Sequence, residues 1–464
     1  MRAAVIGGGI SGLAAARRLA LAGHIVTLFE ADATVGGLIK QVDLGGISVD
    51  IGAEAFATTR PETLNLIEDL GLGRRVASPS QAEARIRSVD AFGDPSLSRI
   101  PRGLLGIPAD LSDPILTETL GSLEVAAAIL RDSKPWQLES PGTLGALVEE
   151  RLGKVILDRF VAPVVAGVHS SDPRLLEVEV VAPGLFQKAK ELGSLSRAAA
   201  AIRANAARPG SAVASLRGGM ITLVQGLSAS LAALAVDVRS GTAVTSIEPK
   251  GESFLLHSGA LEASQSGRSG AEVFDLVVVA VPAGVAARLL SSFSDLSTHL
   301  ARVRMVSVTV VAIRANSATV PAAPYGSGVL LAAGDSLVKA KACTHSSAKW
   351  DFVNQDLEPE GHIFRLSYGR DGVAPAPDEL LLETARSDAN RLFGFKPEEI
   401  TAMAAHRWQG GLVQSGVGHR ELIQAIEKEI SKIPNLAVVS AGLGGNGITG
   451  ALARVNQQLT RIGA

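Results

Sequence analysis

Residues 3–37 read AAVIGGGISGLAAARRLALAGHIVTLFEADATVGG. This stretch predicts, in order, a short apolar strand ending at Ile6, the turn Gly7-x-Gly9-x-x-Gly12, a helix to about Ala22, a strand from Ile25 to Phe29, and then Glu30. The first glycine allows a tight turn, the second lets backbone approach a pyrophosphate, and the third lets the helix pack closely on the strand. The helix N-terminus attracts phosphate, and the acid can accept hydrogen bonds from an adenosine ribose. Because all these parts occur together, we expect a dinucleotide site rather than a plain structural turn.

A second glycine pair bears on which dinucleotide binds. Gly36-Gly37 follows Glu30 closely, and this pairing is typical of enzymes that bind FAD rather than a nicotinamide cofactor. The stretch taken alone therefore favours FAD and leaves NAD open.

The composition bounds the size and the partners of the protein. With 464 residues the chain is long enough for two or three domains with a sizeable core. A net charge of −2 and a pI of about 6.5 provide no basic face, so we expect no nucleic-acid partner. Cys343 is the only cysteine, which excludes an internal disulfide. No His/Cys/Asp cluster has metal-ligand spacing, so we expect no metal.

The hydropathy of the chain bears on its relation to membranes. Hydrophobic residues make up 47% and the mean hydropathy is +0.27, yet no run of about 18 apolar residues escapes a charge. We expect no spanning helix, and a surface that rests on a membrane stays open. Ala20-Leu21-Ala22 imitates a signal-peptide cleavage site, but Arg17 and Arg18 interrupt the apolar core before it. Cleavage would destroy the glycine turn, so we expect a retained N-terminus and a cytoplasmic protein that can be membrane-associated.

The middle of the chain changes from irregular to helical and then to β-rich. Pro, Ser, Gly and scattered charge over 79–114 predict loops or a domain boundary. Helices are expected over 116–130, 144–152, 155–165 and 185–206. Strands are expected over 274–282, 306–314 and 363–368, the first of them a buried parallel strand.

The end of the chain repeats the pattern of strand, glycine turn and helix. A strand over 436–440 precedes four glycines, the last of which is Gly447, and a helix from Ile448 to Arg461. No acid follows at the spacing of an independent nucleotide site, which remains the alternative. We expect this unit to return to the first sheet. Its helix N-terminus would point at a flavin and stabilise negative charge on the reduced form.

With these elements in place the chain resembles the FAD-dependent porphyrinogen oxidases, the protoporphyrinogen and coproporphyrinogen III oxidase family within the amine-oxidase-like flavoproteins. The first motif occurs in many flavoproteins, whereas the order of the whole set is far more specific. The motifs that carry the resemblance are GGGISGLAAA (7–16), Glu30, VGG (35–37), DIGAEAF (50–56), APVVAGVHSSDP (162–173), LRGGMITLVQGL (216–227), GTAVTSIE (241–248), VAVPA (279–283), KACTHSSAKW (341–350), HRW (406–408) and VGH (417–419).

The resemblance implies an α/β fold of the glutathione-reductase and amine-oxidase type. A Rossmann-like FAD-binding domain would be assembled from separated segments, with an inserted β-rich substrate domain and a helical domain that faces a membrane. The implied segments are 1–50, 212–287 and 432–464 for the FAD-binding domain, 51–82, 178–211 and 288–431 for the substrate-binding domain, and 83–177 for the helical domain.

The resemblance also implies the residues that hold the FAD, which would be bound without a covalent link. The implied residues are Gly7, Gly8, Gly9, Ile10, Ser11, Gly12 and Leu13 at the pyrophosphate, Glu30 and Ala31 at the ribose, Gly37 and Lys40 in the segment that follows, Gly52, Ala53, Glu54 and Ala55 beside the flavin, Val244 on the adenine side, and Trp408, Gly447 and Ile448 around the isoalloxazine.

Three departures from the family pattern lie in these segments. Family members usually carry Lys or Arg at the position of Leu38 and Ser or Thr at that of Gln41, so Lys40 is a candidate substitute. The family's Pro-Gln-Tyr is replaced at 413–415 by Val-Gln-Ser, and its Gly-Ile-Pro-x-Cys at 447–451 by Gly-Ile-Thr-Gly-Ala. These departures leave the fold expectation intact and put full activity and the exact substrate in doubt.

The activity implied by the resemblance is oxidation of a porphyrinogen to the porphyrin in heme biosynthesis. Hydrogen would leave in three two-electron steps, with hydride going to flavin N5 and O2 reoxidising the flavin to give H2O2. The implied partners are the porphyrinogen, O2 and a downstream enzyme of the heme pathway. An apolar slot with cationic groups would hold the propionates of the substrate. The candidate substrate contacts are Arg60, His169, Lys341 and Arg365, each with an ordinary structural role as the alternative.

Coproporphyrinogen III is the favoured substrate, and the sequence leaves protoporphyrinogen IX open. A flavoenzyme that oxidises an amine or a polyene is a second hypothesis, although 4% aromatic residues and two tyrosines offer little for the aromatic cage that an amine oxidase needs. A flavin-binding protein with impaired turnover is the third, suggested by the departures at 413–415 and 449–451.

Overall fold

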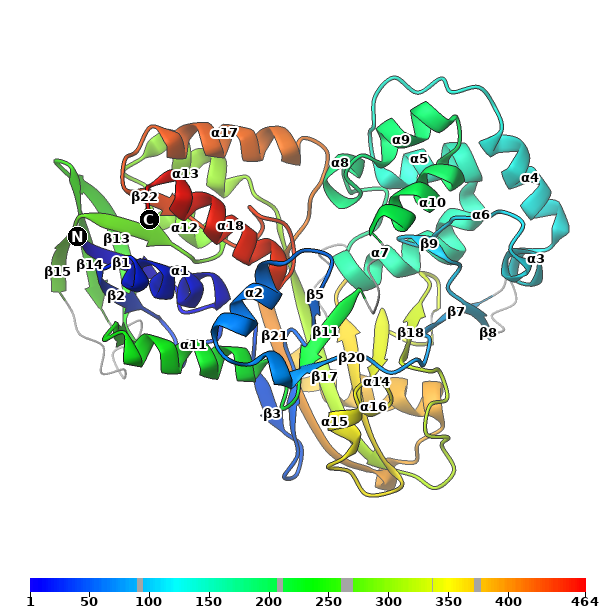
Figure 1. The fold of residues 1–464 in the computed structure, drawn as a ribbon. Helices are drawn as coiled ribbons and strands as arrows, with labels where there is room; N and C mark the ends of the chain where they lie inside the picture. Colours follow the sequence, from blue (N-terminus) through cyan, green and yellow to red (C-terminus); the bar gives the residue numbers. More distant parts are fainter. Residues whose placement is uncertain (90–94, 207–211, 260–269, 336, 371–376) are drawn as a thin grey trace.

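A computed structural model describes residues 1–89, 95–206, 212–259, 270–335, 337–370 and 377–464 (Figure 1). The N-terminal stretch forms the centre of a parallel sheet. Strand β1 (Arg2–Ile6) pairs with β2 (Ile25–Phe29) on one side and with β16 (Leu276–Val279) on the other. The outer strands are β12 (Asp237–Arg239) and β22 (Leu436–Val438), which gives the order β12-β2-β1-β16-β22. Segments from the start, middle and end of the chain therefore share one sheet.

Helices cover one face of this sheet, and a small antiparallel sheet together with three further helices covers the other. On the first face, α1 (Ile10–Leu21), α11 (Ile221–Ala233) and α18 (Ile448–Arg461) contribute to one apolar core with β1 and β16. The second core contains residues of β13 (Ala243–Lys250), β14 (Ser253–Gly259), β15 (Gly270–Phe274), α12 (Ala283–Leu289), α13 (Ser294–Ala301) and α17 (His419–Ser431). Apolar strands buried on both faces are characteristic of parallel sheets, which explains the uninterrupted apolar runs of β1 and β16.

This arrangement confirms two sequence predictions. The strand from the apolar run at 274–282 is parallel to β1, and the C-terminal strand and helix return to the first sheet rather than forming a second nucleotide site. Helix α18 packs against α1, and the two helices share the core that contains Leu13 and Leu452. The α/β fold with a Rossmann-like sheet is thus as expected.

A second, seven-stranded sheet lies beside the first unit (Figure 1). In spatial order its strands are β21 (Ile400–Val413), β17 (Met305–Asn316), β20 (Gly361–Tyr368), β19 (Ala342–His345), β18 (Gly328–Leu331), β7 (Arg85–Val89) and β8 (Pro95–Arg99). Helix α16 (Asp378–Phe393) covers one face, and the hairpin of β3 (Gln41–Asp43) and β4 (Ser48–Asp50) packs on the other. The hairpin brings the segment just before DIGAEAF onto the second sheet.

Loops or a domain boundary were predicted over 79–114; the loop prediction was wrong at four strands, and the boundary stays a prediction. Besides β7 and β8, the segment contains the short antiparallel pair β9 (Gly103–Leu104) and β10 (Ile107–Pro108). Strand β8 lies at the edge of the sheet and is mostly exposed, so its sequence PSLSR has no apolar pattern. Edge strands are often blunted by proline and charge, and such residues also signal loops.

The third region is a cluster of short helices, at the right of Figure 1. Its helices are α3 (Pro114–Leu120), α4 (Ser122–Asp132), α5 (Leu144–Leu152), α6 (Lys154–Ile156), a π-helical turn (Leu157–Val161), α7 (Ala162–His169), α8 (Val178–Val181), α9 (Leu185–Leu192) and α10 (Leu195–Ala206). The helices expected over 116–130 and 185–206 are each interrupted, at Gly121 and Gly193, whose φ angles are +84° and +65°. Gly193 is a left-handed helix cap, and Gly121, with a ψ of 156°, turns the chain out of the helix in another conformation that favours glycine.

No helix among the described residues has the length and apolar character needed to cross a bilayer. The predicted division into three domains stays a prediction. Helices α13 and α17, which the sequence assigns to the substrate domain, contribute to the core beneath the parallel sheet.

Candidate active site

The glycine turn after β1 leaves the N-terminus of α1 open. Gly7 has a φ of +102°, and a Cβ atom at Gly12 would lie 1.8 Å from the carbonyl oxygen of Gly7, so neither position accepts another residue without rearrangement. Gly9 is the N-cap of α1, no side chain caps the helix, and its first turn has no acidic residue. The first backbone N–H groups are therefore available to an anion.

Glu30 lies beside this turn at the end of β2. Its carboxylate accepts hydrogen bonds from the backbone N–H of Gly8 (2.6 Å) and of Asp32 (2.8 Å). Burial raises the pKa of Glu30, while these two N–H donors oppose the rise. The sequence correctly places the acid next to the glycine turn; its contact with a ribose stays a prediction.

Val244 and Ala31 lie near Glu30 through backbone pairing. The N–H of Glu30 donates to the carbonyl of Arg239, and the N–H of Thr242 donates to the carbonyl of Glu30 (2.8 Å). Val244 is buried two residues further on, in the core that also contains Phe29. The segment implied for the adenine side therefore runs beside the acid.

The second glycine pair continues the line from the turn towards DIGAEAF. Gly36 donates to the carbonyl of Gly8 (2.9 Å), and a Cβ atom at Gly37 would lie 2.9 Å from the Cα of Gly9. One residue on, the carbonyl of Leu38 accepts from the N–H of Ala53 (2.9 Å). A side chain at Gly37 would fill the space over Gly9, so both glycines keep this surface open.

Trp408, on the long strand β21, packs against the DIGAEAF loop. A Cβ atom at Gly52 would lie 3.0 Å from the Cζ2 of Trp408 and 2.0 Å from the carbonyl oxygen of Leu38, so only glycine fits between them. His406 packs edge-on against Trp408 with ring centroids 4.0 Å apart. Burial, followed by the charge of Lys40, lowers the pKa of His406. The carbonyl of Lys40 accepts from the N–H of Ile51 (2.9 Å), at the start of the loop.

The N-terminus of α18 reaches the same loop from the C-terminal unit. Gly447 is its N-cap with a φ of +90°, no side chain caps the helix, and the first turn has no acidic residue. Ile448 is buried, and the hydroxyl of Thr449 donates to the carbonyl of Ala57 (3.0 Å), just beyond Ala55. This end of the loop therefore faces a second uncapped helix terminus.

These positions fit an elongated anionic dinucleotide. The implied FAD residues include two helix termini without capping side chains and a carboxylate beside the first of them. They also include Gly12, Gly37 and Gly52, at which a Cβ atom would lie within 3 Å of neighbouring backbone. The structure brings the N-terminal, central and C-terminal members of that set together; their contacts with FAD stay predictions.

Glu54 is held by two cations from the second sheet. Lys349, at the end of α14 (Ser346–Lys349), and Arg365, on β20, each lie 2.5 Å from one of its carboxylate oxygens. Burial alone would raise the pKa of Glu54, but the charges and hydrogen bonds of the two cations outweigh it and lower the pKa to about 2. Sequence reasoning missed Lys349, although it lies in the quoted motif KACTHSSAKW next to Trp350.

The four candidate substrate contacts do not form one cluster. Arg60 is exposed and pairs with Glu62 (2.9 Å), two residues along the chain. Lys341 is buried and donates to the hydroxyl of Ser170 (2.5 Å), which places it near His169 rather than near Arg60. Burial lowers the pKa of His169 to about 4. The guanidinium of Arg365 donates to Glu54 and is therefore occupied by a partner within the protein. All four substrate contacts stay predictions.

The divergent segment 413–415 is well anchored. Asn446 donates to and accepts from the backbone of Val413 (3.3 and 3.1 Å), and the side chain of Gln414 donates to Ser171 (3.2 Å). The carbonyl of Ser415 accepts from the N–H of Glu177 (2.8 Å). The segment therefore joins the C-terminal glycine turn to the helical region, a role that its sequence does not reveal.

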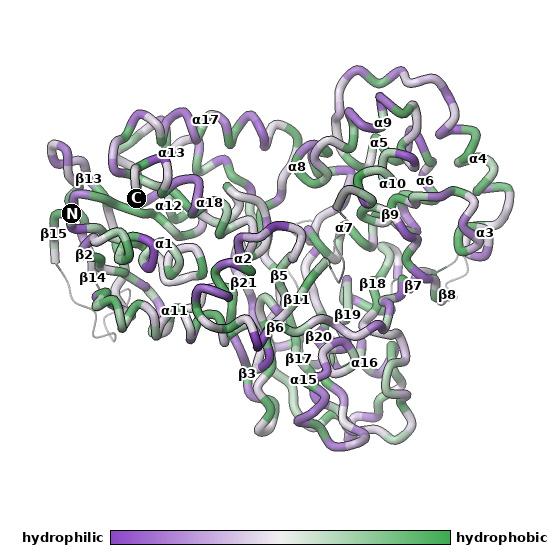
Figure 2. Tube along the Cα trace, viewed as in Figure 1, coloured by the Kyte–Doolittle hydropathy of each residue, from purple (hydrophilic) through white to green (hydrophobic). Residues whose placement is uncertain are grey.

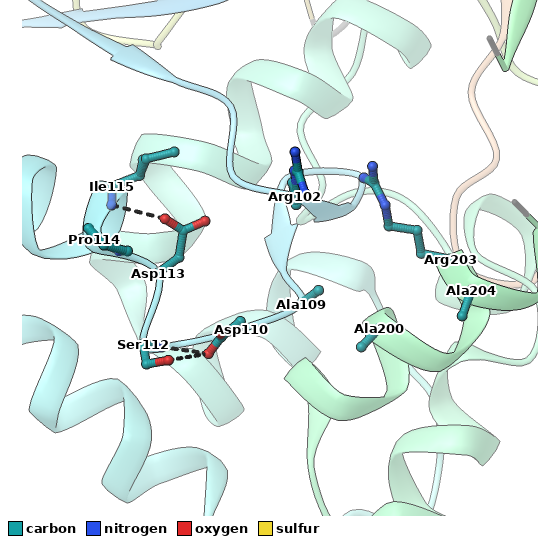
Figure 3. A pocket seen from close by; sticks show the side chains of 10 residues that line it. All are labelled: Arg102, Ala109, Asp110, Ser112, Asp113, Pro114, Ile115, Ala200, Arg203 and Ala204. Atoms are coloured by element: carbon teal, nitrogen blue, oxygen red, sulfur yellow. Dashed lines mark hydrogen bonds between the residues drawn. The ribbon is translucent and has the colours of Figure 1, made fainter. Parts of the chain in front are cut away.

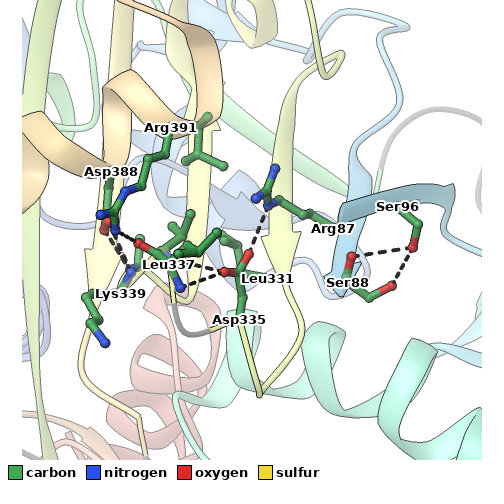
Figure 4. A network of polar contacts seen from close by, with 12 residues as sticks. Arg87, Ser88, Ser96, Leu331, Asp335, Leu337, Lys339, Asp388 and Arg391 are labelled. Carbon is green, nitrogen blue, oxygen red and sulfur yellow. Dashed lines mark hydrogen bonds and ion pairs between the residues drawn. The ribbon is translucent and has the colours of Figure 1, made fainter. Parts of the chain in front are cut away.

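Two other polar features lie away from this line. A surface hollow of about 790 Å³ in the helical region is lined by ten residues, with Arg102 and Arg203 at one side and Asp110 and Asp113 at the other (Figure 3). At the edge of the second sheet, Asp335 pairs with Arg87 (2.9 Å) and Asp388 accepts from the backbone N–H of Lys339 (Figure 4). In the part of the chain that the structure describes, no three His, Cys, Asp or Glu side chains form a metal site.

The comparisons with known proteins agree with this geometry. The profile of the family described as flavin containing amine oxidoreductase matches residues 10–453. The chain belongs to this family. A flavin cofactor and an oxidoreductase activity follow for the chain as family properties.

Curated relatives of this amine oxidoreductase chain match along its whole length. A protein of Mycobacterium tuberculosis named coproporphyrinogen III oxidase is 31% identical over 99% of the chain and 96% of the relative. The Bacillus subtilis protein of the same name is 25% identical over 99% and 98%. A solved structure from Exiguobacterium sp. 255-15, described provisionally as a protoporphyrinogen oxidase, has a TM-score of 0.82 and 23% identity, with 99% and 98% of the two chains covered. The last likeness concerns the fold, which confirms the amine-oxidase-type FAD-binding architecture.

Proposed function

We propose that the protein binds FAD without a covalent link and oxidises a porphyrinogen, with coproporphyrinogen III favoured over protoporphyrinogen IX, in heme biosynthesis. Its main support is the full-length similarity to proteins named coproporphyrinogen III oxidase, 31% identical over 99% of the chain. In each of three steps the substrate would lose two hydrogens and one O2 would become H2O2. Bound FAD would supply the hydride acceptor for these steps.

The residues of the chain would bind and orient the two reactants. The open termini of α1 and α18 would hold negative charge at the pyrophosphate and at the flavin, and Glu30 would hold the ribose. Trp408 and the Gly52 loop would form one wall of the flavin site. Glu54, with a pKa of about 2, stays ionised at neutral pH and so would not accept a proton from a pyrrole N–H.

Two of the candidate substrate contacts, Arg60 and His169, differ in whether they can offer a positive charge to the substrate propionates. Arg60 is the exposed candidate, because its guanidinium reaches only Glu62 among the described partners and 56% of its side chain is accessible. His169 would be neutral at pH 7, because burial lowers its pKa to about 4, and would contact substrate as a hydrogen-bonding imidazole rather than as a cation.

An amine-oxidising activity is the second candidate, favoured by the description of the family as flavin containing amine oxidoreductase. The tyrosines argue against it. Tyr325 donates to the carbonyl of Leu392, and Tyr368 is buried and donates to Asp388, so neither lies at the Gly52 loop to form an aromatic cage. The third candidate, a flavin binder without turnover, makes the same prediction for flavin absorbance and a different one for activity.

The deciding experiment combines an absorbance spectrum with turnover assays. Purified protein should show a flavin spectrum, release FAD on denaturation, and form fluorescent porphyrin and H2O2 from coproporphyrinogen III faster than from protoporphyrinogen IX. A Gly12→Ala variant serves as the flavin-depleted control, since its Cβ atom has no space. Flavin without any porphyrin product would support the non-catalytic candidate, and amine-dependent H2O2 would support the second.

A further inference from the structure

Two cations share one carboxylate directly beside the loop implied to contact the flavin. Lys349 Nζ lies 2.5 Å from Glu54 Oε1, and Arg365 Nη1 lies 2.5 Å from Glu54 Oε2. The side chains are mostly buried, with 20%, 10% and 16% of Lys349, Arg365 and Glu54 accessible. Charge-assisted hydrogen bonds in such surroundings are stronger than those at an exposed surface.

Arg365 also holds the backbone of the loop. Its second terminal nitrogen donates to the carbonyl of Gly52 (2.5 Å), so one guanidinium fixes both the peptide of Gly52 and the side chain of Glu54. On the opposite side, the hydroxyl of Ser215 donates to the carbonyl of Glu54 (2.7 Å). A planar guanidinium can make both contacts in fixed directions, which an ammonium cannot do.

The loop has little room to move without these contacts being broken. Gly52 is enclosed by the carbonyl of Leu38 and the ring of Trp408, and the N–H of Ala53 donates to the same carbonyl of Leu38. The orientation of the Gly52 peptide is therefore fixed from the side of the second sheet by Arg365 and from the side of the glycine pair by Leu38. A ligand carboxylate that bound Arg365 would have to displace Glu54.

We propose that Arg365 and Lys349 are positioning residues that hold the Gly52–Glu54 loop against the flavin by way of Glu54 and the Gly52 carbonyl, and that they do not bind the substrate carboxylates. The inference rests on the proposed function for the location of the flavin. It reassigns Arg365, and it gives Lys349 a role that neither the sequence motifs nor the family description provides.

The test compares conservative variants for FAD binding and for substrate binding separately. Arg365→Lys keeps the charge and loses the fork that joins Glu54 to Gly52. It should weaken FAD binding by at least about tenfold and change the visible circular dichroism of the bound flavin, with the KM for coproporphyrinogen III unchanged in FAD-saturated enzyme. Arg386→Lys is the matched control, because Arg386 donates to the carbonyl of Pro397 on the surface of α16.

A second set of variants tests the charge balance among Glu54, Lys349 and Arg365. Glu54→Gln leaves Lys349 and Arg365 without their shared carboxylate, and it should weaken FAD binding. Adding Lys349→Met removes one of the two repelling cations, so the double variant should recover part of the lost affinity. An additive loss in the double variant would contradict the coupling of the three residues.

The outcomes separate this inference from the proposed function. If Arg365→Lys raises the KM several-fold and leaves FAD affinity and dichroism unchanged, Arg365 binds substrate and the inference is wrong while the proposed function stands. If the wild type binds FAD but does not oxidise a porphyrinogen, the proposed function fails and the FAD measurements still decide the inference. A wild-type chain that binds no FAD would overturn both.

Discussion

At the scale of single residues, the glycine turn gives the sharpest prediction. A methyl group at Gly12 would lie 1.8 Å from the carbonyl oxygen of Gly7, so the Gly12→Ala variant must separate α1 from β1. We expect it to retain less than about a tenth of the wild-type FAD per polypeptide, measured by absorbance after gel filtration.

The control for this variant is a helical glycine with free space. A Cβ atom at Gly284, in α12, would meet nothing within 4 Å, so Gly284→Ala should bind FAD normally and gain about 0.5–1 kcal/mol of stability. Equal FAD content in the two variants would contradict the close approach of α1 to the turn.

Asp50 gives a prediction about pH. Burial raises its pKa to about 6 from an ordinary value of 3.8, although the N–H of Met220 and the charge of Arg365 oppose the rise. Because the folded pKa is the higher one, the contribution of Asp50 to stability is complete below pH 3.8 and is lost as the pH rises through about 6. Asp50→Asn keeps an acceptor for Met220 and cannot ionise.

The pH dependence of unfolding in urea tests this reasoning. Between pH 4 and pH 7.5, the free energy of unfolding of Asp50→Asn should increase relative to wild type by up to about 3 kcal/mol. Parallel pH profiles of the two proteins would show that Asp50 ionises as easily in the folded chain as in the unfolded one.

The residues of the candidate site differ in how far the sequence could predict them. The glycines and Glu30 could be placed because their roles depend on backbone geometry within one strand–turn–helix unit. The bond between Lys349 and Glu54 joins residues 295 positions apart, so no local pattern contains it. Arg365 was singled out as a candidate substrate contact, which stays untested, and its pairing with Glu54, 311 positions away, depends on the tertiary fold.

At the scale of elements, buried hydroxyl groups fix helix α18 to helix α2 and to the segment around Ala57. Thr449 Oγ1 lies 2.8 Å from Thr63 Oγ1 of α2 (Glu62–Asp69) and donates to the carbonyl of Ala57. Replacing Thr449 by Val keeps the shape and leaves buried polar groups without partners. We expect a loss of about 1–3 kcal/mol in the free energy of unfolding.

Two further variants isolate the hydroxyl contribution. Thr449→Ser keeps the hydroxyl and should recover most of the loss. Thr460→Val, on the exposed side of the same helix, removes one of four acceptors of Arg18 and should cost less than about 0.5 kcal/mol. If both valine variants were equally stable, the buried hydroxyl pair would contribute nothing to the position of α18.

The elements that could be predicted are those with a strong apolar pattern. Beyond their first residues, strands β1, β2, β16 and β22 are buried on both faces, so their sequences are apolar there except at Thr27 and are easily recognised. Strand β8 is exposed at a sheet edge, and β9 and β10 have two residues each, so neither periodicity nor length identifies them. Their pairing depends on contacts with distant segments.

At the scale of the whole molecule, the sequence could predict that three separated segments share one sheet. It could not predict how the segment at 413–415 contacts the helical region. The order of apolar strands and the resemblance both required the C-terminal unit to return. The bond from Gln414 to Ser171 joins segments that diverge from the family pattern or carry no periodicity, so only the tertiary structure reveals it.

The outer face of the helical region supplies the last prediction: we propose that this face contacts a membrane, as the resemblance implies. On α4, Leu123 and Leu130 are one heptad apart and are 87% and 68% exposed, with Ile129 beside them at 45%. Figure 2 shows hydrophobic residues along this helix, at the outer edge of the molecule. Apolar side chains on one face of a surface helix can insert into a bilayer interface without spanning it.

Sedimentation with phospholipid vesicles tests the proposal. Leu123→Ser/Leu130→Ser should reduce the vesicle-bound fraction at least about tenfold, because each leucine contributes up to about 1.5–3 kcal/mol when fully buried. Leu380→Ser/Leu382→Ser, on α16 of the second sheet, is the matched control, since these leucines are 52% and 42% exposed and far along the chain from α4. The control should bind vesicles like the wild type. Because all four leucines are exposed, both variants should keep their stability, so weaker binding by the first alone would locate the contact on α4, whereas equal binding by all three proteins would exclude that face.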